Sequence, residues 1–268
     1  MYTTPQQIFI SKNRKVLTKC TGIKSIDTIT AIFFLLSKPE HNNQSWDNTF
    51  ISSDGKSVFF YAERLKYDGP QRGVTIGLAG FTTANSGKDA WGDFHPLATR
   101  YKRMGGVDLT RLARGLTTNT KKASEFCRKI HRLKGKDADL FVRAQLKCLC
   151  RPGGYIYEAV DALKHAGIPS PTPLTIAAVV DTMINQGIGG TWCPKKWLEQ
   201  NPVTSPKRES ALLRDFLRWK RVSATKNHHN SPPRNGEKRS DMFLELLDMG
   251  STDLDRAACE RVVTWKML

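Results

Sequence analysis

Acidic residues and a glycine-rich segment lie close together in the first third of the chain. Glu40 is followed by Glu63 and Asp68, and the run RGVTIGLAGF comes shortly afterwards at 72–81. Two carboxyl groups that face each other can hydrolyse a glycosidic bond, because one protonates the leaving oxygen while the other activates a water or stabilises the cationic sugar. A helix that ends in one carboxylate, followed by a hairpin that carries another, would place two such groups across a cleft.

Local patterns predict the elements that would carry these groups. Ser25 is a suitable N-cap for an apolar helix over 25–36, with Glu40 just past its end and beyond Pro39. Alternating apolar residues predict a hairpin over 73–82, and its glycines would let a polymer approach the backbone closely.

Beyond residue 106 the pattern is helical almost throughout. Thr172 and Pro173 have the preferred N-cap and first-turn order for a helix over 174–185. Because that segment is almost entirely apolar, we expect it to be the central buried helix of the larger lobe. Further helices are predicted over 108–116, 121–133, 137–150, 210–222 and 240–247. A Pro- and Asn-rich loop is expected over 228–236.

Length and composition indicate one globular protein of mixed class, α+β but mostly α. A chain of 268 residues with 39% hydrophobic residues can bury one sizeable core, and it is too apolar to be disordered. We expect a basic lead-in segment over 1–24 and a single catalytic domain over 25–268. Within that domain we expect a small lobe over about 40–105 and a helical lobe over about 106–268.

The net charge of +17 indicates an anionic partner, such as nucleic acid, an acidic membrane surface or a cell-wall polymer. The six cysteines have no paired CxxC spacing, so we expect buried thiols and no zinc site. No signal peptide and no membrane span is expected from the apolar runs. Synthesis in a reducing compartment would suit the free thiols.

A longer pattern links the carboxylates. Glu40 is followed six residues later by Trp46, then by the Tyr-Ala-Glu of 61–63, and then by Asp-Gly and the hairpin within 68–83. This pattern resembles that of the glycoside hydrolase family 46 chitosanases, which belong to the lysozyme-like superfamily. The resemblance implies a two-lobed fold, with a small β-hairpin lobe, a larger helical lobe and a cleft between them. A weaker match covers 181–187.

The resemblance also implies roles. Glu40 would be the general acid, Asp68 the general base, and Thr75 would position the attacking water, with inversion at the anomeric carbon. Glu63 competes for the acid role, because phage-type lysozymes place their catalytic Glu shortly before a similar Thr-Ile-Gly hairpin, and the choice between the two glutamates stays open. The residues expected to contact substrate are Tyr61, Arg72, His41 and Asp89. Two carboxylates and a water suffice for the reaction, so no metal or cofactor is expected.

The charge pattern departs from that of a chitosanase. Chitosan is a polycation, but residues 100–136 carry twelve Lys or Arg against two acidic residues. The family's Asp that holds the substrate amino group falls on Gly87 here, and Asp89 is reached only through an insertion. We therefore favour peptidoglycan hydrolysis of the lysozyme or muramidase type, with chitosan hydrolysis as the alternative.

A third reading is a basic nucleic-acid-binding protein, but aromatic residues do not interleave with the charges and no binding motif is present. As a wall hydrolase without a signal peptide, the protein would act at the bacterial cell wall after delivery by a secretion machine or after lysis. It would then be an antibacterial effector or an endolysin. We expect a monomer, and an immunity or inhibitor protein could accompany it.

Overall fold

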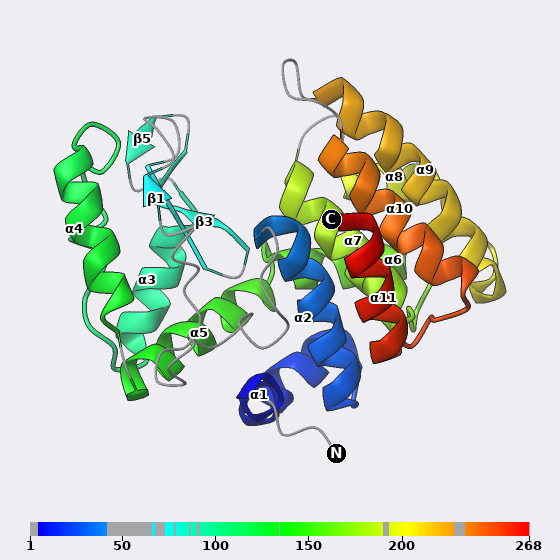
Figure 1. Cartoon of the computed structure of the whole chain (residues 1–268), viewed down its shortest axis with the longest axis horizontal. Helices are drawn as coiled ribbons and strands as arrows, with labels where there is room; N and C mark the ends of the chain where they lie inside the picture. The colour runs from blue at the N-terminus through cyan, green and yellow to red at the C-terminus, as the bar shows by residue number, and fades with distance from the viewer. Residues whose placement is uncertain are drawn as a thin grey trace. The chain divides into compact units, whose positions relative to one another are not determined.

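A computed structural model of the chain describes residues 5–41, 66–67, 73–77, 79–85, 87–89, 92–133, 135–189, 193–227 and 234–267. The chain forms two compact units (Figure 1). Unit 1 comprises Met1–Ile8 and Gln44–Cys148, and unit 2 comprises Phe9–Asn43 and Leu149–Leu268. The larger stretch of unit 1, Gln44–Cys148, is therefore inserted between the two parts of unit 2.

Unit 2 is helical. Its elements are α1 (Pro5–Thr21, which starts in unit 1), α2 (Ile26–His41), α6 (Tyr155–His165), α7 (Pro173–Gln186), α8 (Pro194–Gln200), the 3₁₀ helix η2 (Pro206–Arg208), α9 (Glu209–Asn227), α10 (Arg234–Asp248) and α11 (Arg256–Met267). α7 is the centre of this unit, since it contacts α2, α6, α8, α9 and α10.

The start and the burial of α7 confirm the prediction for this segment. The Thr172 side chain accepts a hydrogen bond from the backbone N–H of Thr175, and Pro173 occupies the first turn. A proline at this position costs no helical hydrogen bond, because the first N–H groups of a helix have no acceptor within it. Every residue from Leu174 to Met183 is buried, so α7 is the core helix that its composition predicts.

α2 begins as predicted and ends later. The Ser25 hydroxyl accepts from the backbone N–H of Thr28 at 3.2 Å, which is an N-cap bond. The helix then continues through Pro39 to His41, so Glu40 lies in its last turn rather than past its end. Pro39 has no N–H to donate to the carbonyl of Leu35, so the helix lacks that one hydrogen bond in its last turns.

In the part of unit 1 that the structure describes, three helices combine with short strands. These elements are β1 (Lys66–Tyr67), β2 (Val74–Ile76), β3 (Phe81–Thr82), β4 (Ala84–Asn85), β5 (Lys88–Asp89), α3 (Phe94–Arg103), α4 (Thr120–His131) and α5 (Gly135–Leu149). The strands form an antiparallel sheet in the order β1-β2-β3 and a separate β4-β5 hairpin. Phe94 of α3 packs edge-on against Phe126 of α4 at 5.5 Å between ring centroids and also contacts Phe141 of α5, which ties the three helices into one core.

The class is mostly helical with a few short strands, as predicted, but the units divide the chain differently from the lobes we expected. Segment 106–148 belongs to unit 1, whereas α2 belongs to unit 2. The expected lead-in segment contains α1, in which Ile10 and Leu17 are fully buried. The helix predicted over 108–116 is instead a series of turns.

Two glycines of the β2–β3 segment have neighbours from within unit 1. Gly77 has φ +80°, and a Cβ placed on it would overlap the buried side-chain amide of Gln145 from α5. Gly73 has φ +68°, and a Cβ there would overlap the hydroxyl of Thr83. The sequence suggested that such glycines admit a polymer. At these two positions the protein's own side chains occupy the space instead.

Gly77→Ala should therefore destabilise the protein. A non-glycine residue at positive φ costs about 1–3 kcal/mol, and the new methyl group would in addition displace Gln145. We expect a loss at the upper end of that range in urea unfolding. Gly105→Ala is the matched control in the same unit, because Gly105 has φ +92° with nothing near its Cβ position. Equal losses in the two variants would contradict the packing role of Gly77.

Candidate active site

Thr75 lies at the centre of the small sheet. It pairs with Lys66 of β1 on one side and with Thr82 of β3 on the other. The flanking residues Val74 and Ile76 are fully buried, so the strand is fixed by burial on both sides of Thr75. The predicted hairpin over 73–82 is confirmed by the β2–β3 pairing.

Side-chain hydrogen bonds fix this hairpin further. The Thr83 hydroxyl accepts from the backbone N–H of Val74 at 2.9 Å. Asp93 Oδ1 accepts from the backbone N–H of Thr82 at 2.6 Å, which ties β3 to the start of α3. Because Asp93 is itself the N-cap residue of α3, one carboxylate joins the strand to the helix that follows.

The structure places the predicted site residues on different elements. Glu40 and His41 are the last two residues of α2 in unit 2, whereas Thr75 on β2 and Asp89 on β5 belong to unit 1. Asp89 pairs with Ala84 across the β4–β5 hairpin. The remaining predicted site residues lie outside the described residues: Tyr61, Glu63, Asp68 and Arg72.

A buried ionic cluster at the core of unit 2 involves Asp181 of α7. Its Oδ2 accepts from Lys220 Nζ of α9 at 2.6 Å, and its Oδ1 accepts from Arg239 of α10 at 2.9 Å. All three side chains are at most 1% exposed. The Lys220 ammonium also lies 5.5 Å from the ring centre of Phe243. Burying charge is costly unless it is paired and hydrogen-bonded, and these contacts provide the pairing.

Comparison with known proteins identifies the fold. Searches with protein-family models and among curated proteins gave no match. A search of solved structures matched the GH46 chitosanase of Gynuella sunshinyii, solved in complex with chitotetraose. The TM-score is 0.53 and the identity 18%, and the match covers 85% of this chain and 91% of that chain.

The chain has the fold of a GH46 chitosanase. This finding agrees with the mostly helical, lysozyme-like class predicted from the sequence. Because the likeness covers most of both chains, it includes elements of both compact units rather than the hairpin segment alone. At this level of identity the likeness establishes the fold alone.

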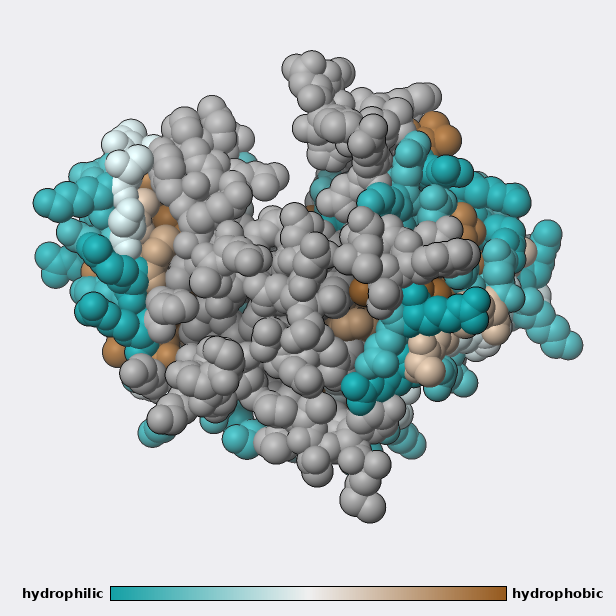
Figure 2. Space-filling view, viewed as in Figure 1, coloured by the Kyte–Doolittle hydropathy of each residue, from teal (hydrophilic) through white to brown (hydrophobic). Residues whose placement is uncertain are grey.

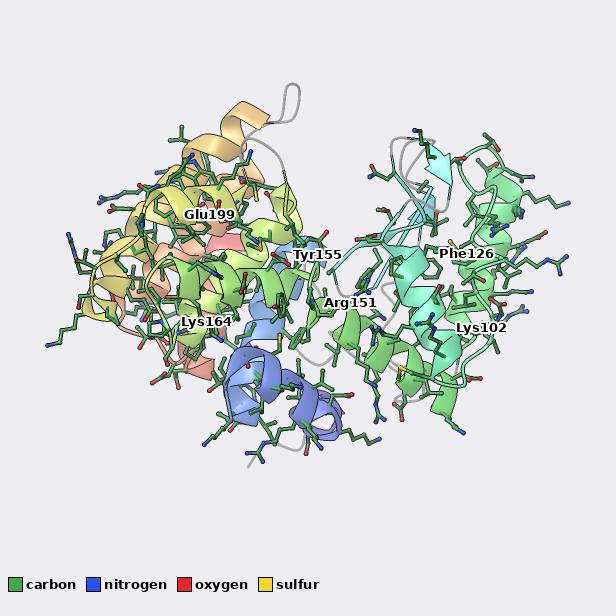
Figure 3. The ribbon with its side chains drawn as sticks, turned by 180° about the vertical axis from the view of Figure 1, so that it is seen from behind. Lys102, Phe126, Arg151, Tyr155, Lys164 and Glu199 are labelled. Carbon is green, nitrogen blue, oxygen red and sulfur yellow. The ribbon has the colours of Figure 1, made fainter. Side chains whose placement is uncertain are left out.

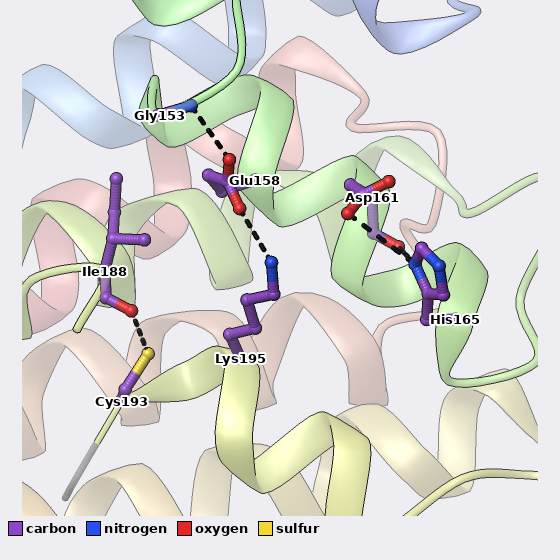
Figure 4. A network of polar contacts seen from close by, with 7 residues as sticks. All are labelled: Gly153, Glu158, Asp161, His165, Ile188, Cys193 and Lys195. Carbon is purple, nitrogen blue, oxygen red and sulfur yellow. Dashed lines mark hydrogen bonds and ion pairs between the residues drawn. The ribbon is translucent and has the colours of Figure 1, made fainter. Parts of the chain in front are cut away.

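Within this GH46-like fold, a polar network joins α6 to α8 on unit 2 (Figure 4). Glu158 of α6 accepts from the backbone N–H of Gly153 at 2.8 Å and from Lys195 Nζ at 3.0 Å. Burial raises the pKa of the Glu158 carboxyl, but the hydrogen bonds from Gly153 and Lys195 outweigh burial and leave it lowered. The pKa of Lys195 is raised, chiefly by its hydrogen bond to Glu158.

These shifts predict how stability depends on pH. A lowered carboxyl pKa contributes stability that is present above the unfolded-state value and lost as pH falls through the folded value. Glu158→Gln should therefore lower the free energy of unfolding by about 1 kcal/mol at pH 7, allowing for the partial exposure of Lys195. The difference from wild type should shrink below about pH 4.

Urea unfolding at pH 7 and at pH 3 measures this difference, with Asp253→Asn, which removes an exposed carboxylate of unit 2, as the control. We expect the control to match wild type at both values of pH. If the Glu158→Gln deficit is the same at pH 3 and pH 7, the carboxylate is not its source.

Sequence reasoning missed Lys220, Arg239 and the Glu158–Lys195 pair. A signal for the first two was present. Lys220 follows Phe216 and Leu217 at helical spacings of four and three, so it lies on the apolar face of α9. Arg239 precedes Phe243 by four residues in the same way on α10. A charged residue at an apolar helical position predicts a buried ion pair.

Among the described residues, no group of three or more His, Cys, Asp or Glu is placed to hold a metal ion.

The cysteines are free thiols, and Cys148, Cys193 and Cys259 are buried while Cys20, Cys127 and Cys150 are half-buried. Of the helices that the structure describes, none is long and apolar enough to span a bilayer.

Proposed function

We propose that the protein hydrolyses β-1,4-glycosidic bonds of bacterial peptidoglycan by carboxylate acid–base catalysis. The observation that carries this proposal is the GH46-type fold over 85% of the chain, together with the sequence pattern that assigns its acid and base to Glu40 and Asp68. Hydrolysis of a glycosidic bond requires one protonated and one ionised carboxyl group on opposite sides of the bond.

The local structure supports these roles. Glu40 lies in the last turn of α2, after a stretch from Ile29 to Leu36 that is buried throughout. The backbone of Thr75 lies in the middle strand of the small sheet, and the proposal assigns the positioning of the attacking water to this residue. Glu63 remains the rival for the acid role.

The charge of the protein favours an anionic polymer over a cationic one. Peptidoglycan carries carboxylates on its peptide stems and is associated with anionic polymers, whereas chitosan carries ammonium groups. A chain with a net charge of +17 repels a polycation and attracts a polyanion.

Chitosan is the second candidate substrate, because the similar protein was solved with chitotetraose. The two substrates can be separated by digesting purified peptidoglycan and chitosan in parallel and identifying the new reducing ends by mass spectrometry. We expect muropeptide products ending in muramic acid. If glucosamine oligomers are released from chitosan and peptidoglycan is not cleaved, the protein is a chitosanase instead.

Delivery to the wall by a secretion machine or by lysis is part of this proposal, as is a cognate immunity protein that inhibits the enzyme in the producing cell. DNA binding without any hydrolysis would point to the nucleic-acid-binding alternative. Lysis of target cells by the purified protein, and its loss in the Glu40→Gln and Glu63→Gln double variant, would exclude that alternative.

A further inference from the structure

One face of α4 in unit 1 is strongly cationic. At 100° per residue, the exposed side chains of this helix and its C-cap fall on one side, and Ala123, Phe126 and Ile130 are buried on the other. The exposed cationic residues, which we call the α4 basic face, are Lys121, Lys122, Arg128, Lys129 and Arg132. Glu125 is the one acidic residue among them. Figure 2 shows hydrophilic surface over α4, and Figure 3 shows nitrogen-tipped side chains projecting from it.

The segment before α4 extends this charge. Arg111 and Arg114 are exposed in the turns that precede the helix. A Cβ on Gly115 would lie 3.2 Å from Lys122 Nζ, so the lysine reaches the last of these turns. The turns and the α4 basic face therefore form a continuous cationic surface.

These charges are not neutralised within the protein. None of the five side chains forms an ion pair in the structure as described, nor do Arg111 and Arg114. The exposed arginines of α9 behave differently. Arg214 pairs with Asp248 at 2.6 Å, Arg218 with Asp215 at 3.6 Å, and Arg221 with Asp241 at 3.8 Å, in an arrangement typical of a solvated helix face.

Two of these charges also oppose the stability of their own helix. Lys121 and Lys122 lie in the first turn of α4, which contains no acidic residue. Cations at a helix N-terminus are destabilising by typically about 0.3–1 kcal/mol each, because the helix dipole is positive there. Local stability therefore does not account for these lysines, whereas a binding partner with negative charge would.

We propose that the α4 basic face binds a polyanionic polymer of the bacterial cell wall whose repeating units carry phosphodiesters. This inference rests on the proposed function and adds to it a surface that holds the enzyme on the wall. Arginine forks and lysine ammonium groups are the usual phosphate ligands. A helix of 12 residues is roughly 18 Å long, which spans several charged repeats.

The absence of stacking groups argues against single-stranded nucleic acid as this partner. Proteins that bind single strands stack aromatic side chains on the bases. Phe126 is the only Phe, Tyr or Trp between residues 104 and 132, and it is 2% exposed. Segment 104–132 can thus contact charges along a polymer, and its one aromatic ring is buried away from any base.

A pair of variants with equal net charge tests the proposal. Lys121→Gln, Arg128→Gln and Arg132→Gln together remove three charges from the α4 basic face. Arg14→Gln, Lys15→Gln and Lys19→Gln remove three exposed charges from α1. Binding is measured by cosedimentation with cell walls that retain their phosphodiester polymer and with the same walls stripped of it, at low and high salt.

We expect the α4 variant to bind intact walls at least tenfold more weakly than wild type at low salt, and the α1 variant to bind within twofold of wild type. Wild-type binding should fall on stripped walls and in high salt, because counterion release drives association with a polyanion. Equal weakening by the two variants would overturn the proposal, as would binding that survives removal of the polymer. Tighter binding to double-stranded DNA than to intact walls would overturn it in favour of nucleic acid.

Hydrolysis of stripped peptidoglycan keeps this test separate from the proposed function. The α4 variant should degrade stripped peptidoglycan at the wild-type rate. If no form of the protein cleaves peptidoglycan while the α4 variant still loses wall binding, the proposed activity fails and the binding surface stands.

Discussion

Glu40→Gln should lower the rate of hydrolysis by about 10²- to 10⁴-fold, the range that a positioned general acid contributes. The amide keeps the size of the side chain and cannot donate a proton to the leaving oxygen. Because the change is isosteric and lies in the last turn of α2, the midpoint of thermal unfolding should stay close to that of wild type. The rate is measured from the release of reducing ends, on whichever polymer the parallel digestion identifies.

Glu63→Gln and Asp68→Asn are assayed separately beside it. Of Glu40→Gln and Glu63→Gln, only one variant should be inactive, and that result identifies the general acid. Asp68→Asn should be inactive in either case, because the base is needed to activate the water. Glu199→Gln on α8 is the control for removal of an exposed carboxylate. If all three site variants keep full activity, the proposed mechanism with these carboxylates as acid and base is wrong.

Asp181→Asn should destabilise the protein by about 3–5 kcal/mol, since removing one partner of a buried ionic cluster leaves uncompensated charge in the core. Two cations, Lys220 and Arg239, would then be buried with no carboxylate between them. The free energy of unfolding in urea measures the effect. Asp215→Asn, which removes an exposed pair with Arg218 at 3.6 Å, should cost less than about 1 kcal/mol.

A triple variant keeps this prediction testable if Asp181→Asn does not fold. Asp181→Leu combined with Lys220→Met and Arg239→Met replaces the whole cluster with apolar side chains. Such replacements are often neutral or stabilising, so the triple variant should be more stable than Asp181→Asn. A loss in Asp181→Asn no larger than in Asp215→Asn would show that the cluster does not stabilise the core.

The elements predicted best from the sequence are those whose ends are fixed by local chemistry. Thr172 and Pro173 define the start of α7 through a side-chain cap and a missing N–H, and both signals act within four residues. The β2–β3 hairpin is of the same kind, because alternating apolar residues and glycines define its register.

Segment 108–116 shows why periodicity alone is insufficient. Leu109, Ala113 and Leu116 are buried at helical spacing, and the backbone N–H of Ala113 bonds the carbonyl of Leu109 as in a helix. However, Asp108 accepts from the backbone N–H of Thr110 at 3.0 Å, and Gly115 has φ +70°. Because of these local interactions the segment forms turns instead of a helix. Its apolar side chains are nevertheless buried in the core.

The residues of the candidate site were predicted from a sequence motif and not from contacts between side chains. The spacing of Glu40, Asp68 and Thr75 in sequence carries the family pattern, and their roles stay predictions, since the structural match bears on the fold alone. The Asp181 cluster depends on three helices whose residues lie 39 and 58 positions away from Asp181. Such pairings are set by how helices pack, which no local window of sequence contains.

The division of unit 2 into two stretches of chain affects how the protein can be made. α2 is buried from Ile29 to Leu36 against α7 and α11, yet all of unit 1 is synthesised before either partner. At about 5–20 residues per second, roughly 10–40 s separate the emergence of α2 from that of α11. Until α7 has been made, the nascent chain carries an apolar helix without either of these native partners. The packing around α2 can be completed only after α11 has followed.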